Sequence, residues 1–135
     1  MSRSNIEIVR QGIDVFGERG LDGLEDATDL YAEDVEFHEG VHLPEPGVYR
    51  GIRQIRDYFR GFVETFEDYS LQIEGIHASG SKVVVVIHHS GRVRGSSAEV
   101  EMRNAWVFKI AFGKISRIEA FGDPNDAFAA AGISA

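Results

Sequence analysis

The spacing of apolar residues changes near residue 68, and this change restricts the possible folds more than any other feature of the sequence. Before it, apolar residues recur every three or four positions, as Ile6, Val9, Ile13 and Phe16 do, which is typical of an amphipathic helix. Beyond it, apolar and polar residues alternate, which indicates β-strands. A chain with its helices first and its strands afterwards is expected to be α+β, with helices on one face of a mainly antiparallel sheet.

The first half of the chain predicts three helices. Ser4 followed by Glu7 is typical of a capping box at the start of the first helix. A shorter second helix carries Leu24 inward, and the inward stripe of a third helix runs over residues 52–66. Residues 39–51 contain prolines and glycines, so we expect a loop there. The predicted strands cover residues 35–38, 69–77, 82–89, 98–110 and 114–121, and a last helix covers residues 125–131 after the cap Asp123.

Composition and charge exclude several classes of protein. A chain of 135 residues, 43% of them apolar, has material for one core, so we expect a single domain over residues 1–135. The absence of cysteine excludes disulfides and thiolate metal sites. A net charge of -8 disfavours a nucleic-acid partner. Because no apolar run could cross a membrane or act as a signal peptide, we expect a cytoplasmic protein.

No metal or organic cofactor is expected either. The sequence contains no glycine-rich phosphate-binding pattern. His38, Glu39, His42 and Glu45 lie around a proline-containing loop, but their spacing matches no known metal-ligand geometry. A solvated loop is the better interpretation of these residues.

The last two predicted strands place a carboxyl group inside the fold. Alternation puts Asn104, Trp106 and Phe108 on one face, which we take as the inner face. If Phe112-Gly113 is a two-residue turn, counting back pairs Trp106 with Glu119 and turns Glu119 inward. A carboxyl on an apolar inner face is suited to proton transfer, which makes Glu119 the leading acid/base candidate. The alternative is a Glu119 at the rim, or one paired with a nearby arginine.

The same register predicts an apolar patch on the outer face of the sheet, made by Ala105, Val107, Ile118 and Ala120. We expect a homodimer through this patch.

One histidine of the pair His88-His89 should also face inward. A two-residue turn within residues 79–81 gives His88 the same face as Leu71, whereas counting from Gly91 favours His89. The first count is slightly preferred.

The order of the elements, together with several short strings, resembles the SnoaL-like polyketide cyclase family of the nuclear transport factor 2-like superfamily. The strings are residues 5–10, 32–35, 46–51, 113–115 and 119–123. The resemblance implies a curved sheet wrapped round helices as a cone, with a mostly apolar pocket between them. Dimers through the outer sheet face are common in such proteins.

The resemblance also implies positions for a site. Ketosteroid isomerase, which has the same fold, places its base close to His38 and Glu39 of this sequence and a carboxylic acid donor near Asn104. Its tyrosine donor corresponds to Ile13, which cannot donate a hydrogen bond, so steroid isomerase chemistry is disfavoured. The Asp pair of the epoxide hydrolases with this fold has no counterpart here.

Two classes of function follow from these observations. The first is a cofactor-free acid/base enzyme, of cyclase, isomerase or dehydratase type, acting on a small hydrophobic carbonyl compound. The second is a non-catalytic module of the same fold that binds a ligand or a protein partner. The candidate catalytic residues are Glu119, His38, Glu39, His88 and Asn104, and the resemblance implies a ligand pocket lined by Trp106, Phe108, Phe59, Ile55, Phe62 and Phe121.

Overall fold

The computed structural model describes residues 4–40, 44, 47–96 and 98–133. Its elements in chain order are α1 (Asn5–Arg19), α2 (Leu21–Asp26), the short 3-10 helix η1 (Thr28–Leu30), β1 (Tyr31–Glu39), β2 (Gly47–Arg50), α3 (Gly51–Glu64), β3 (Phe66–Ser79), β4 (Lys82–Val93), β5 (Glu99–Ala111), β6 (Lys114–Phe121) and α4 (Pro124–Ala131). The strands form one six-stranded sheet in the order β2-β1-β6-β5-β4-β3. Only the β1–β6 pairing is parallel among these neighbours, so the sheet is mixed.

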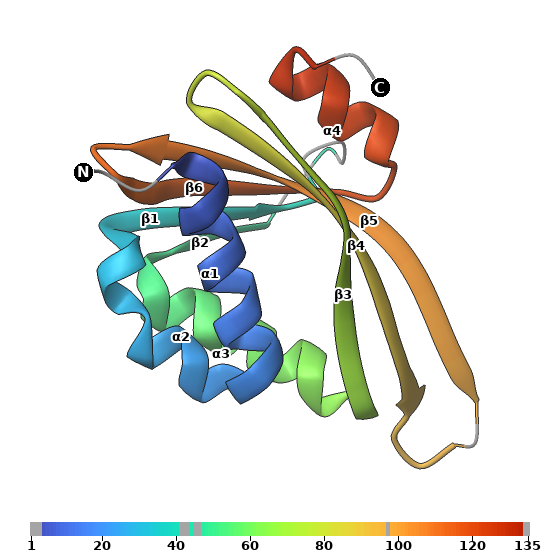
Figure 1. The fold of residues 1–135 in the computed structure, drawn as a ribbon. Coiled ribbons are helices and arrows are strands. Elements are labelled where there is room, and N and C mark those ends of the chain that lie inside the picture. The colour runs from blue at the N-terminus through green and yellow to red at the C-terminus, as the bar shows by residue number, and fades with distance from the viewer. Residues whose placement is uncertain (1–3, 41–43, 45–46, 97, 134–135) are drawn as a thin grey trace.

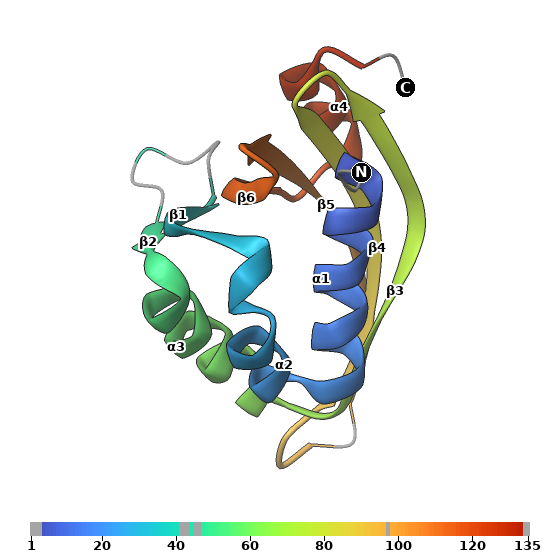
Figure 2. The ribbon, with the colours of Figure 1, turned by 60° about the vertical axis from the view of Figure 1, so that its left-hand side comes forward.

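The sheet curves around the first three helices. Figure 1 and Figure 2 show α1, α2 and α3 on its inner side and α4 against its outer side. The larger core lies between α1, α2, α3 and the inner face, and a smaller core lies under α4. The predicted α+β architecture is therefore confirmed. The sequence missed β2, which lies inside the predicted loop.

The ends of two helices follow from local sequence. The Ser4 hydroxyl accepts a hydrogen bond from the Glu7 amide at 3.2 Å, as the capping box predicts. Asp123 accepts from the Asn125 amide at 2.9 Å and caps α4, with Pro124 in its first turn.

A β-bulge changes the predicted pairing of β5 with β6. The two-residue turn is confirmed, because Ala111 pairs with Lys114. Ser116 is then an extra residue, and its hydroxyl donates to the carbonyl of Lys109 at 3.1 Å. Beyond this bulge the register shifts by one, so that Glu119 pairs with Val107 on the outer face. The predicted inward orientation of Glu119 is wrong for this reason.

The same shift removes the predicted apolar patch. Ala105 and Val107 do lie on the outer face, but they are buried in the core under α4. Ile118 and Ala120 face the opposite way, into the larger core. The patch that suggested a homodimer is therefore not an exposed surface, and the homodimer stays a prediction without this support.

A second bulge lies between β3 and β4. The turn is Gly80-Ser81, since Ser79 pairs with Lys82. Glu74 is the extra residue, because Ile73 pairs with Ile87 and Gly75 pairs with Val86. Because of this bulge Leu71 pairs with His89 and shares the inner face with it, while His88 lies on the outer face. The slight preference for His88 is therefore wrong.

Candidate active site

A cleft of about 360 Å³ opens on the inner side of the sheet, next to α3. Its volume lies within the range of about 300–1,000 Å³ that is typical of small-molecule sites. Its walls combine aromatic rings with a few polar groups. They are formed by Glu39, Tyr58, Phe59, Phe62, His89, Met102, Arg103, Asn104, Trp106, Ala120, Phe121 and Gly122.

The alternation of β1 brings one carboxylate into this cleft. Val35 and Phe37 are fully buried against the helices, and Glu39 continues the same face. The Tyr58 hydroxyl donates to Oε2 of Glu39 at 2.9 Å. Burial, and then the negative charge of Glu39, raise the pKa of Tyr58 above its usual value, so this phenol stays protonated and keeps donating. The Glu39 carboxylate is thus held in place through one oxygen.

Two hydrogen bonds of His89, one to Tyr69 and one to Asn104, hold the Asn104 amide on the wall of the same cleft. His89 is 3% exposed, and its Nε2 lies 2.8 Å from Oδ1 of Asn104. Because a carbonyl oxygen can only accept, Nε2 carries the proton and Nδ1 accepts from the Tyr69 hydroxyl at 2.5 Å. Burial also raises the pKa of Tyr69, which keeps this donor protonated. These two hydrogen bonds therefore fix both the tautomer of His89 and the orientation of Asn104.

The side-chain NH₂ group of Asn104 is available to donate a hydrogen bond to a ligand. Its Oδ1 is occupied by His89, and its Nδ2 makes no hydrogen bond with any residue that the structure describes. An amide N–H group on the wall of a cleft can donate to a carbonyl oxygen or to an oxyanion. The cleft thus combines an oriented carboxylate with an oriented hydrogen-bond donor.

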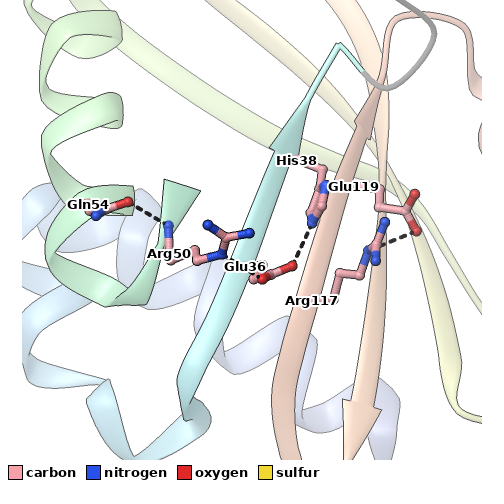
Figure 3. A network of polar contacts seen from close by, with 6 residues as sticks. All are labelled: Glu36, His38, Arg50, Gln54, Arg117 and Glu119. Atoms are coloured by element: carbon pink, nitrogen blue, oxygen red, sulfur yellow. Dashed lines mark hydrogen bonds and ion pairs between the residues drawn. The ribbon is translucent and has the colours of Figure 1, made fainter. Parts of the chain in front are cut away.

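Three of the five candidate catalytic residues lie on the other face of the sheet. Figure 3 shows Glu36, His38, Arg117 and Glu119 on β1 and β6. Nε2 of His38 donates to Oε1 of Glu36 at 2.9 Å, and Nε of Arg50 donates to Oε2 of the same carboxylate at 3.0 Å. The hydrogen bond from His38, and after it the one from Arg50, hold the pKa of Glu36 below its usual value.

Glu119 has a neighbour of its own on that face. Nε of Arg117 lies 3.6 Å from Oε1 of Glu119, as one of the alternatives above anticipated. His88 is the third candidate outside the cleft, and its Nε2 lies 3.9 Å from Oε1 of Glu101. Glu39 and Asn104 are the two candidates that the structure brings together.

The candidate ligand-binding residues divide between two cavities. Phe62 and Phe121 line the cleft, whereas Ile55 and Phe108 line a second, smaller cavity deeper in the core. Phe59 and Trp106 line both.

Sequence reasoning missed Tyr58 and Tyr69. Tyr58 lies three residues after Ile55, so helical spacing alone could have placed it on the inward stripe of α3. Tyr69 required the register of β3 with β4, which the bulge at Glu74 hides.

No group of three or more histidine and acidic side chains is arranged to hold a metal ion among the described residues. His42 and Glu45 lie outside those residues.

In the part of the chain that the structure describes, no helix is long and apolar enough to cross a membrane.

We expect stability to fall at acidic pH because of His89. Its burial, with some repulsion from His88, lowers its pKa below the usual value, although the bond to Asn104 acts in the opposite direction. Below about pH 6.5 the unfolded chain therefore binds a proton that the folded chain does not. The free energy of unfolding should decrease there by up to about 1.4 kcal/mol per pH unit, and less once folded His89 protonates.

Urea unfolding between about pH 5.5 and pH 8 measures this dependence. His89→Gln should flatten the curve in that range, whereas the neighbouring substitution His88→Gln should largely preserve it. Equal pH dependence in the wild type and His89→Gln would contradict the assignment.

Comparison with known proteins gives the same fold throughout. A nuclear transport factor 2-like protein from Burkholderia thailandensis is 26% identical, with a TM-score of 0.76 over 98% of this chain and 99% of that chain. A putative SnoaL-like polyketide cyclase from Jannaschia sp. is 20% identical, with a TM-score of 0.70 over 100% and 99% of the two chains. TerC, co-crystallised with polyporic acid, is 19% identical, with a TM-score of 0.72 over 94% and 96%.

No curated protein matches the sequence. The family model of the SnoaL-like domain, however, matches residues 9–118, which include β1 to β5, the first part of β6, and both Glu39 and Asn104. The resemblance seen in the sequence is confirmed over most of the chain: the protein belongs to the SnoaL-like family.

Proposed function

We propose that this protein is a cofactor-free enzyme that moves a proton at the carbon next to the carbonyl group of a small hydrophobic compound. One observation carries the proposal: Glu39 and Asn104 line the same cleft, and each is held by a hydrogen bond from a further side chain. Isomerases, aldol-type cyclases and dehydratases share this proton-transfer step. The cleft is the proposed active site.

The proposed chemistry uses each group according to what it can do. The carboxylate of Glu39 takes the proton as general base, and the electron pair left behind moves onto the carbonyl oxygen. Nδ2 of Asn104 donates to that oxygen and stabilises the negative charge that it gains. Because an amide cannot exchange a proton, Glu39 also returns the proton, either to the same carbon or to another carbon of the conjugated system.

Two observations support a hydrophobic substrate. Aromatic rings, among them those of Phe59, Phe62 and Trp106, make up much of the wall of the cleft. TerC, which has the same fold, was co-crystallised with polyporic acid.

The test is the exchange of carbon-bound protons of 2-tetralone, a hydrophobic ketone, in heavy water followed by NMR. The wild-type protein should accelerate exchange next to the carbonyl above the buffer rate, with saturation at high ketone concentration. Asn104→Leu removes the proposed donor and should slow the catalysed exchange by about 10- to 1,000-fold.

Gln72→Leu is the matched control, because Gln72 is an exposed amide that pairs with His88, whose side chain lies outside the cleft. This variant should exchange protons at the wild-type rate. A ketone that binds saturably without any accelerated exchange would contradict the proposed enzyme and favour a binding module.

A further inference from the structure

The turn between β5 and β6 holds an aromatic side chain in an unfavourable position. This turn projects from one end of the curved sheet (Figure 1), and Phe112 is its first central residue. Among the residues that the structure describes, Phe112 is the one large hydrophobic side chain that lies exposed, and its exposure is complete. Phe112 and Gly113 both have a positive φ, of 54° and 75°, as in a type I′ turn. Asn, Asp or Gly usually occupies the first position of such a turn.

The fold itself gives no reason for a phenylalanine at this position. An exposed ring gains no stability from burial, and the left-handed backbone of Phe112 lowers stability. A large apolar side chain on a projecting turn is, by contrast, suited to leaving water for another apolar environment. The turn is therefore a candidate interaction surface.

All three lysines of the sequence lie around this turn. Lys109 lies shortly before the turn, Lys114 follows it, and Lys82 pairs with Lys109 across β4 and β5. Lys114 pairs with Ala111, so alternation places the three lysines on the same, outer face of the sheet. Nζ of Lys82 donates to the carbonyl of Ala130 at 3.1 Å. Lys109 and Lys114 are exposed, and their side chains make no hydrogen bond or ion pair with any residue that the structure describes.

A phospholipid surface fits this combination better than a protein partner does. Protein interfaces are depleted in lysine and bury about 800 Å² on each partner, whereas a single ring is the apolar part of this turn. At a membrane, an aromatic ring enters the boundary between headgroups and acyl chains, while flanking lysines reach anionic headgroups. The net charge of -8 leaves the rest of the chain acidic, so repulsion from an anionic surface favours an approach with the lysines first.

We propose that the turn between β5 and β6 docks on membranes that contain anionic lipids, with the ring of Phe112 among the lipids and the three lysines against their phosphate groups. The contact is weak and reversible, because one ring and three cations supply it. The exposed carboxylates of residues 33–34 also lie on β1, which pairs with β6. The docking does not depend on the cleft, and it stands if the cleft proves to be catalytically inert.

The test is co-sedimentation with vesicles made of equal parts of phosphatidylglycerol and phosphatidylcholine, at about 0.1 M salt. The wild type should bind these vesicles and should leave vesicles of phosphatidylcholine alone unbound. Phe112→Asn removes the ring and suits the turn, so it should weaken binding by about tenfold or more and should melt no lower than the wild type. In Phe112→Trp, the fluorescence of the new indole should shift to the blue on binding, because the indole leaves water.

The lysines are tested by two double variants that change the net charge equally. Lys109→Gln with Lys114→Gln should weaken binding by about 20- to 30-fold, since each lysine close to an anionic surface contributes about fivefold. Arg53→Gln with Arg60→Gln removes two exposed cations from α3 instead. This control should bind within about twofold of the wild type, because charges far from the contact are screened by salt.

Three results with vesicles would overturn the proposal. They are no binding of the wild type to the anionic vesicles, equal binding of the wild type and Phe112→Asn, and equally strong binding to phosphatidylcholine alone. Analytical ultracentrifugation without lipid tests the other kind of partner. If the wild type self-associates and Phe112→Asn does not, the turn is a contact between protein molecules and the lipid proposal is wrong.

Discussion

Replacing Glu39 with Gln is expected to slow the exchange of 2-tetralone protons by about 100- to 10,000-fold, the usual contribution of a positioned base. Gln keeps the length of the side chain and an oxygen that can accept from the Tyr58 hydroxyl, which lies 2.9 Å from Oε2 of Glu39. The substitution removes only the ability to take a proton. Rates are measured by NMR at equal protein concentration, and the urea unfolding curve of Glu39→Gln should match that of the wild type to within about 1 kcal/mol.

Glu119→Gln is the matched control. It makes the same chemical change on the outer face, where Glu119 is half-buried and lies 3.6 Å from Nε of Arg117. This variant should exchange protons at the wild-type rate. If Glu119→Gln lost activity and Glu39→Gln kept it, the base would not lie in the cleft.

Phe37→Ala is expected to destabilise the fold by about 3–5 kcal/mol, as large-to-small substitutions of buried phenylalanines do. Phe37 is 0% exposed, and its ring centroid lies 5.1 Å from that of Phe59, 5.5 Å from that of Tyr58 and 6.1 Å from that of Trp106. The substitution leaves a cavity at the centre of this aromatic cluster. Urea unfolding at neutral pH measures the loss.

Phe112→Ala is the matched control, because it makes the same substitution at a fully exposed position. Phe112 is fully exposed at the tip of the β5–β6 turn, with a φ of 54° that strains Phe and Ala alike. Its free energy of unfolding should stay within about 0.5 kcal/mol of the wild-type value. Comparable losses in the two variants would contradict the description of the core.

Local pattern was sufficient to predict the helices and most of the strands. The capping box at Ser4 and the spacing of apolar residues in α1 and α3 act over a few positions, so they can be read without the tertiary fold. The strand β2 is only four residues long and follows two prolines, so its alternation is too short to be recognised inside a proline- and glycine-containing loop.

The faces of two strands could not be read in the same way. Ser116 and Glu74 are bulged residues, and each moves the following pairs by one position, which reverses the side of the sheet on which a side chain lies. Neither residue type is restricted to bulges. In β4 the buried run from Val83 to Ile87 removes the alternation itself, because both faces are covered, so the face of His89 could not be inferred.

The part of the site that was predicted depends on shorter-range patterns. Asn104 shares its face with Trp106 through simple alternation, and the fold resemblance indicated the end of β1, where Glu39 lies. Alternation also decides between the two neighbours there, because buried Phe37 places Glu39 inward and His38 outward.

The most direct test of the proposed base is a crystal structure of the Glu39→Gln variant soaked with 2-tetralone, since an inactive variant should hold the unreacted ketone. We expect the ketone in the cleft, with its carbonyl oxygen within hydrogen-bond distance of Nδ2 of Asn104 and the adjacent carbon facing the side chain at position 39. A ketone bound with its carbonyl turned away from Asn104, or bound on the outer face beside Glu119, would contradict the proposal.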